Sequence, residues 1–420
     1  MTDAPASSSP LANLRVLELA DGTGQFCGKL LGDLGADVIK IEPPGGEPCR
    51  RLGPFVDDIP HPERSLPFWY YNTSKRGITL DLGTADGRDL FRRLAATTDV
   101  VLETFRPGHL SSLGCGYETL SKDNPGLILC SLTPFGQTGP WRNYLSSDLL
   151  HMAAGGEMAS SGYDEIDVTD GPPIAPGGGN AWHMGCHFAY MAIIAALVHR
   201  TVSGRGQYID VSIHEACALT TESAIANYVY RGEVLQRHTG RHHAAGPSPR
   251  TQFRAADGNY VCALIGGRLV PKYIKELADL LDTNGMAGDL RDPKYHDQAV
   301  ITANTSHIID ELVAGFIASL PAEEIYHRAQ ERGFTWGPVR APEQLLDDPH
   351  LADRGFWKEV THPEIGRTVT YPGEAAIYSG SPWRISRRAP LVGEHNAEIL
   401  CGELGLSPGE LTMLAENRVI

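Results

Sequence analysis

The strongest constraint on the fold is a regular alternation of short apolar segments with helical segments in the N-terminal part of the chain. The segment 14–19 has the apolar pattern of a buried strand, a loop with two glycines follows at 20–24, and the segment 25–34 has apolar residues at helical spacing. The pattern then recurs, with strands expected at 37–41, 78–82, 99–102 and 127–132 and a helix at 87–97. Strands that alternate with helices in this way predict an α/β fold with a doubly wound parallel sheet.

The rest of the chain divides into further parts by its composition. A long apolar run at 184–198 is too short to span a membrane and favours a buried core helix. A segment rich in His, Gly, Arg and Pro at 237–249 is typical of a linker or an exposed loop. We therefore expect the N-terminal part of a large Rossmann-like domain at 1–207, a linker at 208–250, a small α+β domain at 251–335, and a segment at 336–420 that resumes strands and turns.

Composition and charge argue against several classes of partner. The chain has 420 residues with 36 Lys+Arg and 51 Asp+Glu, which gives a formal net charge of −15. Nucleic acid and anionic membrane surfaces are poor partners for such a chain, because both require clustered Lys and Arg. The eight cysteines form no C-x-x-C pair, and the N-terminus lacks the basic and apolar regions of a signal peptide. We expect a cytoplasmic protein with reduced thiols, no metal site, and neither nucleic acid nor membrane as a partner.

The glycines of the first loop invite comparison with dinucleotide-binding proteins. Their spacing, Gly22-x-Gly24-x-x-x-Gly28, is one residue longer than the G-x-G-x-x-G fingerprint, and no acidic residue closes a second strand at the required distance. Bound NAD is therefore not expected. A tight turn from strand to helix explains the glycines better.

Six motifs spread along the chain are more specific than any single glycine pattern. They lie, in order, at 34–42, 72–82, 105–108, 135–140, 203–207 and 388–395, and read LGADVIKIE, NTSKRGITLDL, FRPG, FGQTGP, SGRGQ and RAPLVGEH. Together they closely resemble the class III coenzyme A transferases, the family of formyl-CoA transferase, carnitine-CoA transferase and α-methylacyl-CoA racemase. The resemblance extends over 11–420, nearly the whole chain.

This resemblance implies a fold, an assembly and a set of substrates. The segment 336–420 is expected to complete the Rossmann-like domain, and two ring-shaped subunits are expected to interlock, as a homodimer or as a heterodimer with a paralogous subunit. The implied substrates are an acyl-CoA and a small carboxylic acid, with no permanently bound cofactor. The implied CoA-binding residues are Asn72, Lys75, Arg76, Thr104, Phe105 and Arg106. Lys and Arg suit phosphate groups because they form charge-assisted hydrogen bonds, although Lys75 and Arg76 are also compatible with a solvated strand entry.

The family's nucleophile has no counterpart at the expected position. Its transferases use an aspartate that attacks the thioester and gives a mixed anhydride, shortly after a Gly-Pro-Pro turn and just before a long helix. Counting from Gly171 or back from Ala195 places this aspartate at Ala181 or Trp182. No aspartate occurs between Asp170 and Asp210. The resemblance therefore identifies a family member that lacks the usual nucleophile.

Two nearby residues are candidate replacements. His183 could act as a general base, or it could simply be hydrogen-bonded at a helix start. Asp170 could reach the site if the loop after it folds back, or it could be a turn residue ahead of Gly171. Racemisation is not expected, because Ser147 occupies the position before Asp148 at which the racemase has its proton-transferring histidine.

Two hypotheses of different class follow. In the first, the chain is a transferase that moves CoA between an acyl-CoA and a carboxylic acid, through another nucleophile or by exchange in a ternary complex. In the second, the chain is a catalytically silent, CoA-binding subunit whose partner carries the aspartate. Transfer by the purified chain alone would distinguish the two.

Overall fold

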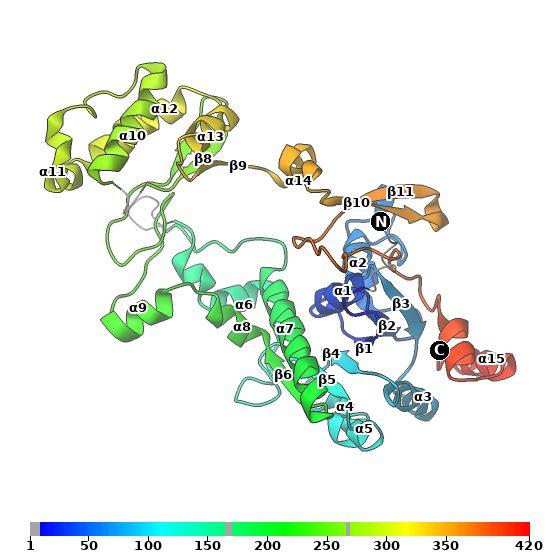
Figure 1. Ribbon diagram of the computed structural model, residues 1–420. Helices are drawn as coiled ribbons and strands as arrows, with labels where there is room; N and C mark the ends of the chain where they lie inside the picture. The colour runs from blue at the N-terminus through cyan, green and yellow to red at the C-terminus, as the bar shows by residue number, and fades with distance from the viewer. Residues whose placement is uncertain (1–8, 164–169, 266–268) are drawn as a thin grey trace. The chain divides into compact units, whose positions relative to one another are not determined.

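The computed structural model describes residues 9–163, 170–265 and 269–420, and its described part forms two compact units (Figure 1). Unit 1 comprises Met1–Gly155, Gly177–Thr220 and His350–Ile420. Unit 2 comprises Gly156–Pro176 and Thr221–Pro349. Both ends of the chain thus belong to unit 1, and most of unit 2 lies between them in sequence.

Unit 1 is built on a six-stranded sheet in the order β3-β2-β1-β4-β5-β6, in which every strand pair is parallel. The strands are β1 (Arg15–Leu19), β2 (Asp37–Glu42), β3 (Lys75–Thr79), β4 (Val100–Glu103), β5 (Ile128–Thr133) and β6 (Tyr208–Ser212). The first five strands are almost entirely buried, as expected for a parallel sheet with helices on both faces. The predicted Rossmann-like α/β fold is confirmed.

The strand order reverses at the centre of the sheet. β1 pairs with β2 on one side, where Val16 lies opposite Val38, and with β4 on the other, where Leu17 lies opposite Val101. The carboxyl ends of β1 and β4 therefore meet at a topological switch point. Open α/β sheets bind their ligands in the crevice outside such a point.

Helices connect the strands of unit 1. They are α1 (Gln25–Asp33), α2 (Leu66–Tyr71), α3 (Ala85–Ala95), α4 (His109–Ser112), α5 (Tyr117–Asp123), α6 (Asp148–Ala154), α7 (Asn180–Ser203), α8 (Ile213–Leu219), α14 (Pro349–Asp353, from the last residue of unit 2 into unit 1) and α15 (Pro408–Glu416). The apolar run at 184–198 lies within α7. Small or apolar residues of this helix, including Gly185, Ala189 and Ile193, are buried where α7 contacts α1, α8 and β5. By length and composition α7 is also the one described helix that could cross a membrane, which is weak evidence for a span.

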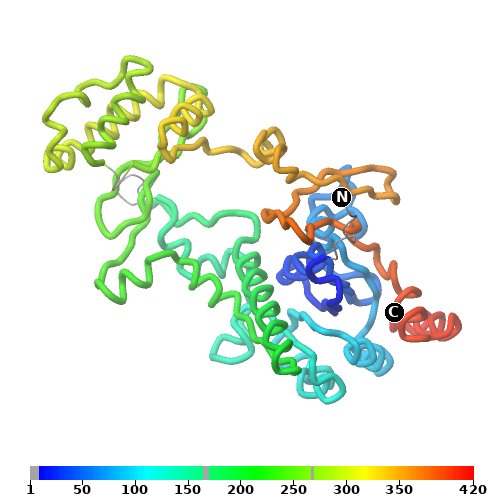
Figure 2. Tube along the Cα trace, viewed as in Figure 1, coloured from blue at the N-terminus to red at the C-terminus, as the bar shows by residue number. Residues whose placement is uncertain are grey.

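The C-terminal segment of unit 1 packs along β3. The hairpin of β10 (Trp357–His362) and β11 (Arg367–Pro372) comes first, and the turn η9 (Ala397–Glu403) and helix α15 follow. At the edge of the sheet, the backbone N–H of Gly77 in β3 donates to His395 Nδ1, 3.1 Å away, and the N–H of Ser74, just before β3, donates to the carbonyl of Arg387 at 2.9 Å. Figure 2 shows this late segment, in orange and red, beside the N-terminal strands in blue.

Unit 2 has its own sheet and its own core. Its antiparallel strands are β7 (Gln252–Arg254), β8 (Tyr260–Ala263) and β9 (Trp336–Val339), in the order β7-β8-β9. Its helices are α9 (Ala224–Arg231), α10 (Pro271–Leu281), α11 (Gln298–Ala303), the π-helical turn η6 (His307–Val313), α12 (Ala314–Ala318) and α13 (Ala322–Gln330). Apolar residues such as Leu277, Phe316 and Trp336 are buried in one cluster. An α+β unit of this kind matches the small central domain in the predicted fold class.

Three boundaries differ from the sequence-based expectation. Residues 208–212 form the edge strand β6 and residues 213–219 form α8, so the first part of the expected linker belongs to unit 1. Residues 156–176 group with unit 2 although they were expected in the large domain, and unit 2 continues to Pro349, past the expected end at 335. These differences reflect contacts between residues distant in sequence, which composition does not report.

Candidate active site

Two loops meet at the switch point of unit 1. The backbone N–H of Asp21, which follows β1, donates to Thr104 Oγ1, which follows β4, at 2.9 Å, and this hydroxyl donates back to Asp21 Oδ1 at 3.1 Å. Asp21 Oδ1 also accepts from the backbone N–H of Thr23 at 2.9 Å. Gly24 is required here, because a Cβ at this position would lie 2.5 Å from Thr104 Cγ2. The glycine loop leads from β1 into α1, the strand-to-helix turn that was expected, and Gly24 in addition allows it to pack closely against the loop after β4.

The turn after β4 presents an unpaired cation. Arg106 is exposed, and no ion pair or hydrogen bond of its guanidinium occurs among the described residues. The preceding residue, Phe105, donates its backbone N–H to Glu103 Oε2 at 2.6 Å, and its ring contacts that of His109 with centroids 4.9 Å apart. These contacts fix the turn while leaving Arg106 available for an anionic ligand. Phosphate groups bind arginine in this way.

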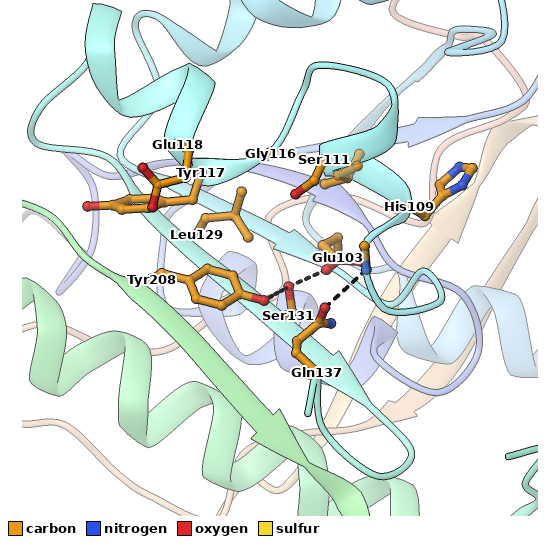
Figure 3. Close-up of a pocket in the computed structure, with 12 residues that line it drawn as sticks. Glu103, His109, Ser111, Gly116, Tyr117, Glu118, Leu129, Ser131, Gln137 and Tyr208 are labelled. Carbon is orange, nitrogen blue, oxygen red and sulfur yellow. Dashed lines mark hydrogen bonds between the residues drawn. The ribbon is translucent and has the colours of Figure 1, made fainter. Parts of the chain in front are cut away.

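A pocket of about 250 Å³ lies beside this turn, with Glu103 at its base (Figure 3). Tyr208 donates its hydroxyl proton to Ser131 Oγ at 3.0 Å, and Ser131 in turn donates to Glu103. Burial raises the pKa of Glu103 to about 7, although hydrogen bonds from Ser131 and Phe105 oppose this change. The side chain is therefore a partly protonated carboxyl group near neutral pH.

The other three predicted CoA-binding residues lie in the interior. All three donors of Lys75 Nζ are used, by Glu18 Oε2 at 2.7 Å, by the carbonyl of Gln25 at 2.9 Å and by Asn72 Oδ1 at 2.9 Å. Arg76 forms ion pairs with three carboxylates, those of Asp37, Glu398 and Glu403. Lys75 and Asn72 have no exposed surface, so a solvated strand entry is wrong for this segment.

These contacts assign Asn72, Lys75 and Arg76 a structural role. Gly28 in α1 leaves room for the Glu18–Lys75 ion pair, because a Cβ there would lie 1.6 Å from Glu18 Oε2. Arg76 links β3 to the C-terminal segment through Glu398 and Glu403. Each donor of Lys75 Nζ thus has an internal partner in the described structure, and the CoA contact expected for this lysine stays a prediction.

A second group of side chains lies at the start of α7. His183 Nε2 is hydrogen-bonded to the hydroxyl of Tyr71, at the end of α2, with 2.8 Å between the two atoms. The ring of Phe26 packs against that of His183, with centroids 4.6 Å apart. Burial and the neighbouring His187 lower the pKa of His183, and burial raises the pKa of Tyr71. A neutral imidazole therefore faces a protonated phenol at neutral pH.

The start of α7 is connected to the glycine loop. Cys186, nearly two turns into the helix, donates its thiol proton to the carbonyl of Thr23, with Sγ and O 3.3 Å apart. Contacts thus connect Thr104, the Asp21–Gly24 loop and Cys186; Arg106 follows Thr104 by two residues, and His183 lies one turn before Cys186. Sequence reasoning identified Arg106 and His183 as candidates but did not predict the hydrogen bond between Cys186 and Thr23.

The position expected for the family's nucleophile is occupied by the first turn of α7. Ala181 is fully buried, and its backbone N–H donates to Asp148 Oδ1, at the start of α6, at 2.8 Å. Trp182 is partly buried. Asp170, the second candidate from sequence, is an exposed turn residue of unit 2 with a φ of 58°, whereas His183 belongs to unit 1. Asp170 and His183 therefore belong to different units of the described structure.

Sequence reasoning missed Glu103, Ser131 and Tyr208 as site residues and did not expect Tyr71 beside His183 or Asp148 beside Ala181. Glu103 was detectable in principle, because it is an acidic residue at the carboxyl end of a buried parallel strand. Tyr71 and Asp148 depend on pairings between residues 112 and 33 positions apart, respectively, for which the sequence contains no local signal.

Comparisons with known proteins agree with this architecture. A sequence model of CoA-transferase family III matches residues 11–396. A subunit of the succinyl-CoA:(R)-benzylsuccinate CoA-transferase of Thauera aromatica is 34% identical over 93% of this chain and 94% of its own length. The succinyl-CoA–D-citramalate CoA-transferase of Chloroflexus aurantiacus is 33% identical over 98% of both chains. The crystal structure of a CAIB/BAIF family protein from Brucella suis superimposes with a TM-score of 0.80 at 30% identity, covering 94% of this chain and 99% of that one.

The Rossmann-like unit and the extent of these matches define a class of enzyme that transfers coenzyme A. The chain belongs to CoA-transferase family III. Its reaction class is the movement of CoA between an acyl-CoA thioester and a carboxylic acid, as the resemblance implied.

Proposed function

We propose that this chain exchanges CoA between the thioester of a short dicarboxylic acid, of the succinyl-CoA type, and a second dicarboxylic acid. The single observation that carries the proposal is the set of contacts that joins Thr104, in the turn that bears Arg106, through the Asp21–Gly24 loop to Cys186, one turn after His183. The two relatives described above, which are similar over nearly their whole length, are named for transfer from succinyl-CoA to a substituted four-carbon dicarboxylate.

In this proposal CoA lies across the switch point with its nucleotide end at the turn after β4. Arg106 pairs with a phosphate group, and the pocket beside Glu103 receives the adenosine end. The backbone at Gly22–Gly24 accompanies the pantetheine chain towards α7. The thioester then lies near His183 and Tyr71, which the loop contact at Cys186 holds next to the crevice.

The exchange itself proceeds between the two substrates. An oxygen of the acceptor carboxylate attacks the thioester carbon, the carbon–sulfur bond breaks, and CoA leaves as a thiolate. The thiolate then attacks the acceptor carbonyl of the mixed anhydride and releases the donor as a carboxylate, so no proton is gained or lost overall. His183 and Tyr71 share one hydrogen bond, so this pair has one N–H or O–H left to donate, and we place that donor at the oxygen that becomes negatively charged, where it contributes most.

A second candidate function is a silent CoA-binding subunit of a heteromeric transferase. Two observations favour it. No Asp or Glu occurs from Gly171 to Ile209, which includes the start of α7, and the relative from Thauera aromatica is itself named as a subunit. We propose that the chain acts in the cytoplasm as part of an interlocked dimer, either with a second copy or with a paralogous subunit that carries the aspartate.

One experiment separates the two candidates. The purified chain is incubated with succinyl-CoA and, separately, (R)-benzylsuccinate or D-citramalate, and the new CoA ester is quantified by mass spectrometry. Transfer by the chain alone supports direct exchange. CoA binding in calorimetry without transfer, with activity restored by an aspartate-bearing paralogue, supports the silent subunit. Absence of CoA binding contradicts both.

A further inference from the structure

Unit 2 contains a cluster of one carboxylate and two imidazoles that the transfer reaction does not use. Glu222 lies just before α9, and His242 and His243 lie in the loop that leads to β7. Glu222 Oε2 is 3.5 Å from His242 Nε2 and 3.3 Å from His243 Nε2, and the three atoms lie within 4.8 Å of one another. The backbone at Glu222 has a φ of 53°, which is uncommon for a residue with a side chain.

The hydrogen bonding of His242 determines which atom faces Glu222. His242 Nδ1 lies 3.1 Å from the backbone carbonyl oxygen of His243, and a carbonyl can only accept, so Nδ1 carries a proton. His242 Nε2 therefore faces the carboxylate oxygen of Glu222, where both atoms can bind the same cation. A backbone carbonyl that fixes the tautomer of a histidine is also the usual support of a metal ligand.

The spacing of the three atoms fits a metal ion. Zinc binds imidazole nitrogen at about 2.0–2.1 Å and carboxylate oxygen at about 2.0–2.2 Å in tetrahedral geometry, which separates neighbouring ligand atoms by about 3.4 Å. The two separations from Glu222 Oε2 agree with this value.

An additional carboxylate favours a cation at this position. Glu157 acts electrostatically on His243, and its Oε1 atom is buried without a hydrogen-bond partner among the described residues. Buried acceptors normally have a partner, which is a protein donor, an ordered water or an ion, and the negative charge of Glu157 adds to the attraction of this cluster for a cation. No metal site was expected from the sequence, because the cysteines form no C-x-x-C pair. That argument does not apply to this cluster, which contains no cysteine and whose ligands Glu222 and His242 are 20 residues apart.

We propose that Glu222, His242 and His243 bind a divalent transition-metal ion of the zinc type, with one coordination position left to solvent. Imidazole and carboxylate ligands suit such an ion, and three protein ligands leave the fourth position open. The ion would link the residue before α9 to the loop at 236–251, whose own contacts include two isolated bridges, Gln236 to Ala244 and Arg241 to Arg250. The site lies in unit 2 and does not depend on the proposed transfer reaction.

The test uses the full chain without a histidine tag, freed of metal by a chelator and titrated with Co²⁺. We expect about one equivalent to bind with the visible absorption of tetrahedral Co²⁺ and to be displaced by Zn²⁺. Glu222→Gln and His242→Asn should each weaken binding at least about tenfold. The matched control, His238→Asn, changes another histidine of the same loop and should bind Co²⁺ as the unaltered chain does.

Thermal unfolding provides an independent readout. Side chains of Glu222 and His242 are 59% and 55% exposed, so their substitution should leave the apo fold intact. Zn²⁺ should raise the Tm of the unaltered chain but not that of Glu222→Gln. The proposal is overturned if the unaltered chain binds no Co²⁺, if the two variants bind as tightly as it does, or if a thiolate charge-transfer band places the metal on cysteine.

Discussion

At the scale of single residues, Arg106 is the cation that the fold leaves unpaired at the switch point. By contrast, Lys75 and Arg76, which precede it in sequence and carry the same charge, are bound by internal carboxylates. A guanidinium without internal partners is free to bind phosphate, and a hydrogen bond to a charged group contributes about 1.5–3 kcal/mol. Arg106→Ala should therefore weaken CoA binding about tenfold to a hundredfold in calorimetry.

The matched control for this measurement is Arg354→Ala. Arg354 is also an exposed arginine of unit 1, but it lies in the C-terminal segment, away from the β4 turn. Its substitution should leave the affinity for CoA unchanged. Equal affinities for Arg106→Ala and the unaltered chain would remove the turn after β4 from the binding site.

His183 differs from an ordinary exposed histidine because burial and His187 lower its pKa. If the neutral imidazole is the active form, transfer activity stays constant as the pH falls through 6.5 and declines only at lower pH.

His183→Ala should reduce kcat about 10²- to 10⁴-fold, the range of a positioned proton-transfer or hydrogen-bonding group. Succinyl-CoA turnover measured from pH 5 to 8 checks both statements, with the exposed His199→Ala of α7 as control. Undiminished turnover in His183→Ala would exclude this histidine from the reaction.

At the scale of elements, β3 shows how far the sequence determines the structure. Hydrophobicity predicted the strand at 78–82, whereas it spans Lys75–Thr79. The shift arises because two charged residues lie inside the strand, neutralised by partners such as Glu18, 57 positions away, and Glu403, 327 positions away. Strands β1, β2, β4 and β5 were predicted to within one or two residues, although β1 and β2 also contain paired charges, Glu18 and Lys40. In β1 and β2 apolar residues flank the charged ones, whereas β3 begins with two adjacent charged residues, and of these five strands local pattern misplaced only β3.

The ion pair that anchors β3 also makes a stability prediction. Glu18 lies fully buried between Lys40 and Lys75, at 3.2 Å and 2.7 Å. Glu18→Gln would leave Lys75 as a buried charge without its counterion, and losing one partner of a buried pair typically costs about 3–5 kcal/mol. The midpoint of urea denaturation, followed by circular dichroism, should fall accordingly. The exposed Glu416→Gln should change it little, and a similarly small effect of Glu18→Gln would show that the pair is not needed for folding.

The carboxyl group of Glu103, at the end of β4, makes stability depend on pH. Its pKa in the folded protein is raised by burial from 4.5 to about 7. Between these values the folded protein holds a proton that the unfolded chain has released, so stability is highest below pH 4.5 for this group and falls as the pH rises to 7. The loss amounts to about 3 kcal/mol at 1.36 kcal/mol per pH unit.

Glu103→Gln removes this titration. Its unfolding midpoint should therefore fall less between pH 5 and pH 8 than that of the unaltered chain. Glu118→Gln, at an exposed carboxylate lining the same pocket, provides the control and should keep the original pH dependence. Identical pH profiles for Glu103→Gln and the unaltered chain would show that Glu103 ionises at its ordinary pKa.

At the scale of the whole molecule, the sequence predicted the class of fold and of reaction but not the assembly of the site. Motifs such as 34–42 and 388–395 are contiguous, so their resemblance to the family is visible without a structure. The pairing of Tyr71 with His183 and of Asp148 with Ala181 joins elements that are far apart in sequence. Composition likewise could not place 156–176 in unit 2, because that grouping depends on contacts formed only in the fold.

An exposed apolar surface on α9 bears on the proposed dimer. Tyr228, Val229 and Tyr230 are 64%, 66% and 87% exposed, and Ile225 on the same helix is 55% exposed. Contiguous apolar surface of this kind is uncommon on a monomer and marks a protein interface. We therefore expect the purified chain to be dimeric in light scattering, or to become so only with a paralogous subunit.

The double substitution Val229→Glu with Tyr230→Glu should shift the assembly towards monomer. The free energy needed to desolvate two carboxylates in an interface exceeds the free energy gained from the contact. Leu346→Glu places a charge at another exposed apolar residue of unit 2, 58% exposed, and should leave the mass unchanged. A dimer that persists in the α9 variant would place the interface elsewhere, and a chain that remains monomeric with every paralogue would contradict the interlocked assembly.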